Sequence, residues 1–319
     1  MTTPTTAHGT FAGVDHIGVG VTDMERSLRF YATLGFTDVA FDVTTDLPGL
    51  AAVTGRERTS ARVVLVRSAN ATPLGPGALK LVQTLDRPPA PAPAGQAWGE
   101  LGICEICLHV KDQPAMYRRL TEELGAASLM EPDESLVPPL DTRCSMSYVA
   151  DPDGAKIEII DWADLQQGWP AEPGIQGVNH VAFGVADIER SRAFYRQLGF
   201  SGQLFETDGQ LPSMDPWFLP RTPPSQRMML LTSPYGAGME PVQHTPPSPD
   251  MRGDWGHVGP YEFAIAVRSI ERAIEHLTAI GTEILGSPHE VDLGGGASWR
   301  YAYFRDPDDL YVYVTEVRA

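Results

Sequence analysis

The chain is poor in cysteine, in basic residues and in long hydrophobic runs. Its three cysteines are an odd number, so they cannot all pair within one chain and a disulfide framework is not expected. Lysine and arginine number 24 against 41 aspartates and glutamates, a net charge of −17. Such an acidic surface repels nucleic-acid phosphates and anionic lipids, so we expect neither nucleic acid nor membrane as a partner. No run approaches the roughly 20 apolar residues of a membrane helix, and residues 1–14 lack an export signal pattern. These absences predict a protein of the reducing cytoplasm.

A long repeat organises the chain. The segment GVDHIGVGVTDMERSLRFYATLGF at 13–36 aligns without a gap with GVNHVAFGVADIERSRAFYRQLGF at 177–200, and 14 of 24 positions are identical. A second pair of similar segments, at 148–160 and 303–315, lies near the end of each half. The halves are therefore a duplication. Within the first half, EICLHV at 105–110 is a looser copy of the strand that opens the repeat, so we predict four modules in series.

Each module is predicted to have the order β-α-β-β-β. In the first module, apolar residues alternate with His16 and two glycines along 16–21, which is typical of a half-buried strand. Apolar residues then recur at helical spacing over 24–34, with Asp23 as a candidate N-cap and Gly35 as a candidate residue just beyond the helix.

Three motifs together resemble the vicinal oxygen chelate superfamily. They are a histidine on the first strand, an F-Y-x-x-L-G-F helix end and a D-P-D-G-x-x-I-E strand at 151–158. That superfamily contains glyoxalase I, methylmalonyl-CoA epimerase, fosfomycin-resistance proteins, bleomycin-binding proteins and extradiol dioxygenases. The resemblance covers 11–317 and implies an α+β fold, in which βαβββ modules pair into two glyoxalase/dioxygenase-like domains with cupped mixed sheets. It says less about the reaction, because this fold hosts several chemistries and pure binders.

Domain boundaries follow from the repeat and from proline- and glycine-rich segments. We expect a disordered tail at 1–10, a linker at 166–176, and at 233–253 a long seam that is either a loop over a site or a tolerated insertion. The expected first domain is 11–165, with modules 11–85 and 100–162, and the expected second domain is 177–319, with modules 177–233 and 258–317.

The resemblance also implies a metal site. Carried over residue by residue, the family's ligand positions fall on His16, Glu105 and Glu158, and a fourth position, Glu in glyoxalases, is Lys80. One imidazole and two carboxylates suit one divalent ion with open positions for two substrate oxygens, and Fe, Mn, Zn, Ni, Co and Mg are not distinguished. The same positions of the second half are His180, Met229, Glu262 and Tyr313. Because that set has lost a carboxylate, we expect the ion in the first half.

Further residues are candidates for catalysis beside such an ion. Lys80 is a candidate partner for an anionic substrate or a developing enolate, and His109 and Tyr148 are candidate acid, base or orienting groups. Glu105 has two alternative roles, as a general base or as the ion-pair partner of Lys80. The two cysteines of the C-x-x-C segment at 104–107 would lie on opposite faces of a strand, so this spacing does not indicate a zinc or redox motif.

The function expected from these residues is metal-dependent chemistry of glyoxalase, isomerase or lyase type on a small oxygenated substrate. The ion would polarise a substrate oxygen and stabilise an enolate or alkoxide. An extradiol-type dioxygenase is one alternative, although it normally uses two histidines and one carboxylate. A metal-free small-molecule binding or resistance protein is another, since six tryptophans could line its pocket. Monomer and homodimer both remain open.

Overall fold

The computed structural model describes residues 10–47, 49–68, 77–137, 142–162, 174–209 and 225–318, and side chains at 135–137, 142 and 176 are not described. The expected tail at 1–10 and linker at 166–176 therefore lie largely outside the described residues. The first module comprises β1 (Phe11–Gly20), α1 (Met24–Thr33), β2 (Phe36–Asp46), α2 (Ala51–Thr54), β3 (Ser60–Ser68) and β4 (Ala78–Thr84). The second comprises β5 (Gly102–Lys111), α3 (Gln113–Arg118), the π-helical turn η1 (Arg119–Glu123), β6 (Ser128–Val137), β7 (Thr142–Ala150) and β8 (Lys156–Trp162).

The second half repeats this order. The third module comprises β9 (Gly174–Gly184), α4 (Ile188–Gln197), β10 (Gly202–Gly209), β11 (Ser225–Thr232) and β12 (Gly238–Thr245). The fourth comprises β13 (Gly259–Val267), α6 (Ile270–Ala279), β14 (Ile284–Gly294), β15 (Ala297–Arg305) and β16 (Tyr311–Arg318). The prediction of an α+β fold built from four βαβββ modules is confirmed. None of the described helices is long and apolar enough to cross a membrane.

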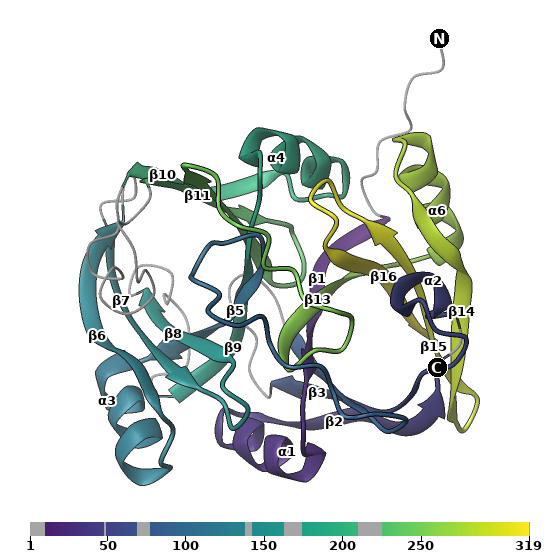
Figure 1. The fold of residues 1–319 in the computed structure, drawn as a ribbon. Coiled ribbons are helices and arrows are strands. Elements are labelled where there is room, and N and C mark those ends of the chain that lie inside the picture. The colour runs from purple at the N-terminus through teal and green to yellow at the C-terminus, as the bar shows by residue number, and fades with distance from the viewer. Residues whose placement is uncertain are drawn as a thin grey trace.

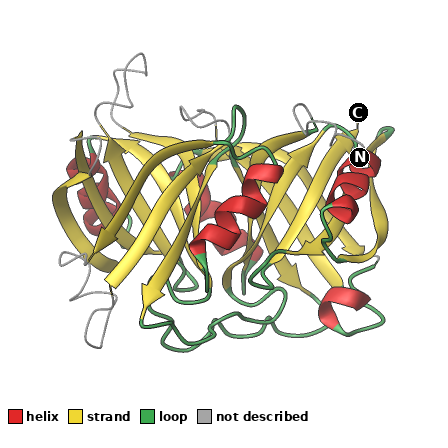
Figure 2. Cartoon of the chain, turned by 90° about the horizontal axis from the view of Figure 1, so that it is seen from above, coloured by secondary structure: helices red, strands yellow, loops and turns green. Residues whose placement is uncertain are grey.

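The strands form two curled eight-stranded mixed sheets, which lie side by side with helices on their outer faces (Figures 1 and 2). One sheet has the order β14-β15-β16-β13-β1-β4-β3-β2 and joins the first and fourth modules. The other has the order β10-β11-β12-β9-β5-β8-β7-β6 and joins the second and third modules. We call the concave face of the first sheet cup A and that of the second sheet cup B.

This pairing differs from the expected domains 11–165 and 177–319, which would have paired modules that are adjacent in sequence. Instead β1 runs antiparallel to β13, with Ile17 opposite Phe263, and β5 runs antiparallel to β9, with Cys107 opposite His180. The cause is that the opening strands of all four modules have similar apolar alternation, so local pattern does not specify which of them become neighbours.

The third module also extends further than expected. The segment 233–253 was predicted as a seam, but strand β12 occupies 238–245 within it. Pro241 made the segment resemble a loop, because proline is rare inside sheets. Pro241 is nevertheless paired in the parallel ladder with β9, opposite Phe183.

Modules that are adjacent in sequence are joined by other contacts. Tyr31 on α1 donates a hydrogen bond to Asp151 in the D-P-D turn of the second module, at 2.9 Å. In the second half, Tyr195 on α4 donates to Asp306 in the equivalent turn, at 2.7 Å. The tyrosine of the F-Y-x-x-L-G-F motif and the aspartate of the D-P-D motif therefore contact each other, which explains why the two motifs occur together in each half.

The main hydrophobic core lies between the helices and the convex faces of both sheets. It includes Tyr31 of α1, Ile17 of β1 and Ile106 of β5, each fully buried. Phe183 of β9 and Phe263 of β13 stack at a centroid distance of 5.4 Å. One continuous core therefore holds the two sheets together and fixes the backs of both cups.

The inside of cup A is filled mainly by aromatic side chains. Trp299, Tyr301 and Tyr303 of β15 belong to one buried cluster with Tyr313 of β16. Leu50 and Val53, at the start and within α2, belong to the same cluster, and α2 lies beside β14 (Figure 1). The inside of cup B has fewer aromatic residues and holds several carboxylates.

Candidate metal centre in cup B

Four polar side chains meet on the concave face of cup B, each from a different strand. They are His180 on β9, Glu240 on β12, Glu105 on β5 and Glu158 on β8. The sheet register places them together, because Ala182, two residues beyond His180, lies opposite both Glu240 and Glu105. All four side chains are at most 7% exposed.

The three carboxylates surround one nitrogen of the imidazole. His180 Nε2 lies 3.5 Å from Glu240 Oε2, 3.7 Å from Glu105 Oε1 and 3.8 Å from Glu158 Oε2. Glu105, His180 and Glu240 each place a ligand atom within 4.8 Å of the others. With metal–ligand bonds of about 2.0–2.2 Å, donors around one ion lie about 3–3.6 Å apart, so the cluster needs little contraction to hold a divalent cation.

Several donor atoms of the cluster have no hydrogen-bond partner. Within the described part of the chain this is true of Glu105 Oε1, Glu158 Oε2 and His180 Nε2. A buried, unpartnered polar atom is costly unless something else satisfies it. Glu105 Oε1 and Glu158 Oε2 both lie within 3.8 Å of His180 Nε2, so a cation bound beside this nitrogen would give these atoms a partner.

Neighbouring side chains hold two of the candidate ligands in place. Trp98 Nε1 donates to Glu105 Oε2 at 2.8 Å, which leaves the other carboxylate oxygen for the cluster. Asn179 Oδ1 lies 2.9 Å from His180 Nδ1, so Nδ1 donates its proton to Asn179 and Nε2 is the ring nitrogen that faces the carboxylates. This arrangement is typical of metal-binding histidines.

The electrostatics of the cluster also favour a cation. Burial and the charge of Glu105 raise the pKa of Glu158 to about 8, and burial raises the pKa of Glu240. Burial alone would lower the pKa of His180, but the negative charges of Glu240, Glu105 and Glu158 close to its ring raise it to about 10. Without metal, the cluster therefore retains protons, which a divalent ion would displace.

Cys107 also lies beside the cluster. Its sulfur is within 4.8 Å of ligand atoms of Glu158 and His180. Burial and the charge of Glu158 raise the pKa of this thiol well above its usual value. The Cys107 thiol is therefore protonated in the metal-free cluster, and its sulfur is close enough to Glu158 and His180 to be a further candidate ligand.

Cup A has different chemistry at the four equivalent positions, which are His16, Lys80, Glu262 and Tyr313. Lys80 Nζ forms an ion pair with Glu262 Oε1 at 2.5 Å, and His16 Nε2 is hydrogen-bonded to the Tyr313 hydroxyl. Trp255 donates to Glu262 at 3.1 Å, just as Trp98 donates to Glu105 in cup B. In cup A the positive charge beside Glu262 is therefore supplied by the protein itself, as the ammonium group of Lys80.

The structure brings together only part of the predicted metal site. Glu105 and Glu158 meet in cup B, but His16 lies in the other sheet and contacts Tyr313. The histidine beside the two carboxylates is His180, which the sequence assigned to a poorer second site. The reason is that the second module pairs with the third and not with the first. The histidine beside Glu105 and Glu158 is therefore His180, which occupies the same position in the repeat as His16.

Glu240 was missed because its strand was predicted as a seam and Met229 was aligned in its place. A signal was available, since LKLVQT at 79–84 and MEPVQH at 239–244 share a V-Q pair, and their alignment places Glu240 on Lys80. The sheet register agrees, because Gly18 pairs with Lys80 and Ala182 pairs with Glu240.

Of the predicted catalytic residues, Lys80 lies in cup A and pairs with Glu262, so its alternative pairing with Glu105 is not found. His109 and Tyr148 lie in the sheet of cup B, and each residue is at most 1% exposed. Burial, together with the nearby His180, lowers the pKa of His109 to about 3. Burial and the charges of Glu105 and Glu158 raise the pKa of Tyr148 well above its usual value.

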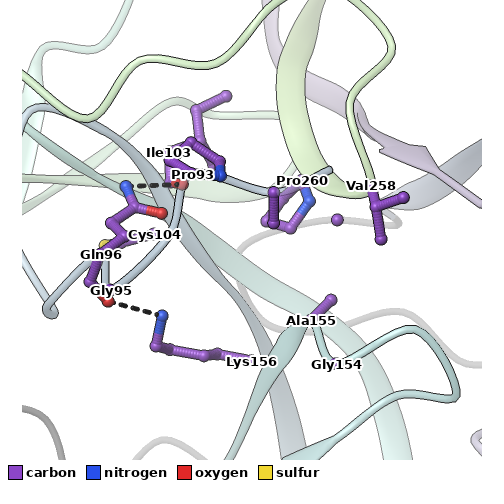
Figure 3. Close-up of a pocket in the computed structure, with 12 residues that line it drawn as sticks. Pro93, Gly95, Gln96, Ile103, Cys104, Gly154, Ala155, Lys156, Val258 and Pro260 are labelled. Atoms are coloured by element: carbon purple, nitrogen blue, oxygen red, sulfur yellow. Dashed lines mark hydrogen bonds between the residues drawn. The ribbon is translucent and has the colours of Figure 1, made fainter. Parts of the chain in front are cut away.

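A small pocket lies beside the segment that joins β4 to β5. Its volume is about 180 Å³, and Figure 3 shows Lys156 at its edge, with the ammonium group donating to Gln96 O at 3.1 Å. The pocket also reaches Cys104, the neighbour of Glu105 in the chain. Lys156 therefore brings a positive charge to β8 two residues before Glu158.

Comparison with known proteins agrees with the fold. The family model described as Glyoxalase/Bleomycin resistance protein/Dioxygenase superfamily matches residues 13–159 and 177–313. A glyoxalase I variant from Zea mays is 16% identical, with a TM-score of 0.56 over 95% of this chain and 92% of that one. A putative dioxygenase from Bacillus subtilis is 10% identical, with a TM-score of 0.56 over 96% of this chain and 86% of that one. No curated protein matches the chain significantly. At these identities the solved structures show a shared fold alone.

Proposed function

Because the chain belongs to the Glyoxalase/Bleomycin resistance protein/Dioxygenase superfamily, we propose that it is a metal-dependent enzyme of glyoxalase, isomerase or lyase type. The proposed metal site is His180, Glu105, Glu158 and Glu240 in cup B. The observation that carries this proposal is the buried cluster itself, in which three carboxylates face an imidazole nitrogen at 3.5–3.8 Å and three donor atoms have no other partner among the described residues.

The donor set indicates the kind of ion. Three carboxylates and one imidazole suit a hard or borderline divalent cation, and Fe, Mn, Zn, Ni, Co and Mg all remain candidates. A bound ion of this kind supplies Lewis acidity, which polarises a carbonyl or hydroxyl oxygen and stabilises an enolate or alkoxide. The proposed substrate is accordingly a small molecule with two neighbouring oxygens.

Residues of the chain would orient the ligands and handle protons. Trp98 and Asn179 hold Glu105 and His180 in the orientation described above. His109 is an uncharged imidazole at neutral pH, because its pKa is lowered to about 3. Since so weak a base is a poor proton acceptor, we assign it to orienting the substrate through a hydrogen bond. Tyr148 keeps its proton, because its pKa is raised, and can donate a hydrogen bond inside the cup.

An extradiol-type dioxygenase is the second candidate. The observation that favours it is His109, a second buried imidazole, whose pKa is lowered by burial and by the charge of the nearby His180. Two histidines and one carboxylate are the ligand set of non-haem iron oxygenases. The cluster of three carboxylates fits the first proposal better, because it offers more negative charge than such an iron site uses.

The test is metal content per chain, measured by elemental analysis on untagged protein that has been stripped with a chelator and re-equilibrated with each candidate ion. We expect about one ion per chain. Glu158→Ala should abolish retention, and Tyr313→Ala, the same position in cup A, should leave it unchanged. Loss in both variants, or in neither, would contradict the assignment to cup B.

The chemistry is tested separately by exchange of carbon-bound protons in D₂O, followed by NMR on a panel of α-hydroxycarbonyl compounds. We expect exchange that requires the ion and that is strongly reduced by His109→Gln without loss of metal. Iron as the one retained ion, with oxygen uptake on catechols, would instead support the dioxygenase. A protein that retains no ion in any condition would be a metal-free binder, and the proposal would be wrong.

A further inference from the structure

Cup A has an opening of its own at the end where β3, β13 and β16 finish. We propose that this opening is a second binding site, which takes a small anionic molecule with a carboxylate or phosphate group and an apolar body. The pocket has a volume of about 350 Å³ and is bordered by Arg67 and Arg268. This is within the range of small-molecule sites, about 300–1,000 Å³. The site is separate from the proposed metal centre, because it lies in the other sheet.

The pocket exists because small residues of cup A replace large ones of cup B. In cup B, His109 and Ile160 lie opposite each other on β5 and β8. The equivalent pair in cup A is Ala266 and Thr315, on β13 and β16. Both line the pocket, so the space that an imidazole and a butyl group fill in cup B is open in cup A.

A third position enlarges the same opening. Two residues beyond Thr315 is Val317, which lines the pocket and is 48% exposed. The residue at that position in cup B is Trp162, which packs edge-on against Phe205 at a centroid distance of 5.5 Å and is 1% exposed. Cup B is therefore closed at the end where cup A is open.

The charges around the pocket leave cationic groups available. Arg67 forms a long ion pair with Asp38 at 3.9 Å and its side chain is 51% exposed. In the described part of the chain the guanidinium of Arg268 forms no ion pair, and only its backbone N–H is bonded, to Thr10 O. Arginine recognises carboxylate and phosphate oxygens through its planar set of donors.

The acidic groups at the pocket already have partners. Asp15 is hydrogen-bonded to His16 at 2.6 Å. Glu316 accepts from Arg300 at 3.2 Å and from Arg318 at 2.6 Å. Arg67 also interacts with the charge of Asp15, so Arg268 is the cation of the pocket that has no acidic partner among the described residues. With the exposed Arg67 beside it, Arg268 gives the opening a cationic group that can attract an anion.

The floor of the pocket adds an apolar surface. Leu65 of β3 and Ala266 of β13 line it together with Val317. Deeper in the cup, Lys80 and Glu262 neutralise each other, so an anion at the opening meets no unpaired carboxylate from this pair. Binding in cup A should therefore need no metal ion, and this distinguishes it from the function proposed for cup B.

The test uses benzoate and phenyl phosphate as anionic probes and benzamide as the neutral probe, each titrated by calorimetry into the full chain with and without divalent metal. We expect one anion per chain, with the same affinity in both states, and no measurable binding of benzamide. The stronger of the two anions identifies the preferred head group. Equal binding of benzamide, or anion binding that appears only with metal, would overturn the proposal.

Variants locate the site. Arg67→Gln and Arg268→Gln should each weaken anion binding by about tenfold, since each removes a charge-assisted contact. Val317→Trp, which introduces the residue found in cup B, should abolish binding without changing the net charge. Arg56→Gln is the matched control, because Arg56 is exposed and does not line the pocket. If Arg56→Gln weakens binding as much as the pocket variants do, or if Val317→Trp has no effect, the site is not in cup A.

Discussion

The ion pair between Lys80 and Glu262 provides a direct test of how cup A differs from cup B. Both side chains are at most 2% exposed, and the ammonium lies 2.5 Å from a carboxylate oxygen. Lys80 Nζ also lies 4.4 Å from the ring centroid of Tyr313 and 5.1 Å from that of Trp299. The perturbation is Lys80→Met, which keeps a long side chain and removes the charge.

The expected loss follows from what Glu262 retains. Removing one partner of a buried ion pair typically costs about 3–5 kcal/mol, because the other charge stays buried. Glu262 still accepts hydrogen bonds from Trp255 at 3.1 Å and from Tyr303 at 2.5 Å, which favours the lower end of that range. Loss of the two cation–π contacts adds about 1 kcal/mol. We therefore expect Lys80→Met to lower the free energy of unfolding of this cup by about 4 kcal/mol.

Urea unfolding, followed by tryptophan fluorescence and circular dichroism, measures this loss. Lys80→Met combined with Glu262→Gln should be more stable than Lys80→Met alone, because the uncompensated charge is gone. Lys156→Met is the control, since Lys156 is half-buried and its one described hydrogen bond is to Gln96 O; it should cost about 1 kcal/mol. A loss below about 1 kcal/mol for Lys80→Met, or additive effects in the double variant, would refute the view that the lysine takes the place of a metal ion.

Three further predictions concern cup B. Glu240→Gln should weaken metal binding by at least about 100-fold, whereas Glu262→Gln in cup A should not, and calorimetric titration with the retained ion checks both. In the metal-free protein, His180 and Glu158 have pKa values raised to about 10 and about 8. Above about pH 7, where histidines with lowered pKa values such as His109 are uncharged in both states, the folded state therefore binds more protons than the unfolded chain. The free energy of unfolding should fall as pH rises from about 7 to about 10, and metal-loaded protein should lack this slope in thermal unfolding. Trp98→Phe removes the N–H that holds Glu105 and should weaken metal binding by about 10–100-fold with little change in the fold, by titration and circular dichroism.

The sequence predicted the modules well because their signals are local. Alternating apolar residues, the N-cap at Asp23 and the tyrosine and aspartate of the repeated motifs each act within one module or between neighbours in sequence. Two carboxylates of the candidate site, Glu105 and Glu158, could be placed for the same reason, since both lie in the second module. The other two residues of the site, His180 and Glu240, could not be placed in this way, because they belong to the third module and reach the site through a long-range strand pairing.

That pairing is not encoded in any short segment. β1 and β9 carry the same repeat, with a histidine at the same position, so either strand could by pattern lie beside β5. The two cups differ in charge, and this difference becomes visible only when Lys80 and Glu240 are recognised as equivalent. Because Pro241 makes strand β12 resemble a loop in the sequence, the equivalence of Glu240 and Lys80 was not recognised there.

Both cups bury a glutamate at the same strand position, but they balance its charge in different ways. In each, a glutamate sits at the same strand position, held by a tryptophan seven residues earlier, as Trp98 holds Glu105 and Trp255 holds Glu262. A buried carboxylate needs a cation nearby or it will take up a proton. In cup A the chain supplies that cation as Lys80, so the charge is balanced when folding is complete. In cup B the equivalent residue is Glu240 and a further carboxylate stands where cup A has a tyrosine, so the charge is balanced only when a proton or a divalent ion is bound. Two changes among four equivalent positions therefore separate a cup that is complete without metal from one whose folding and ligand binding are coupled.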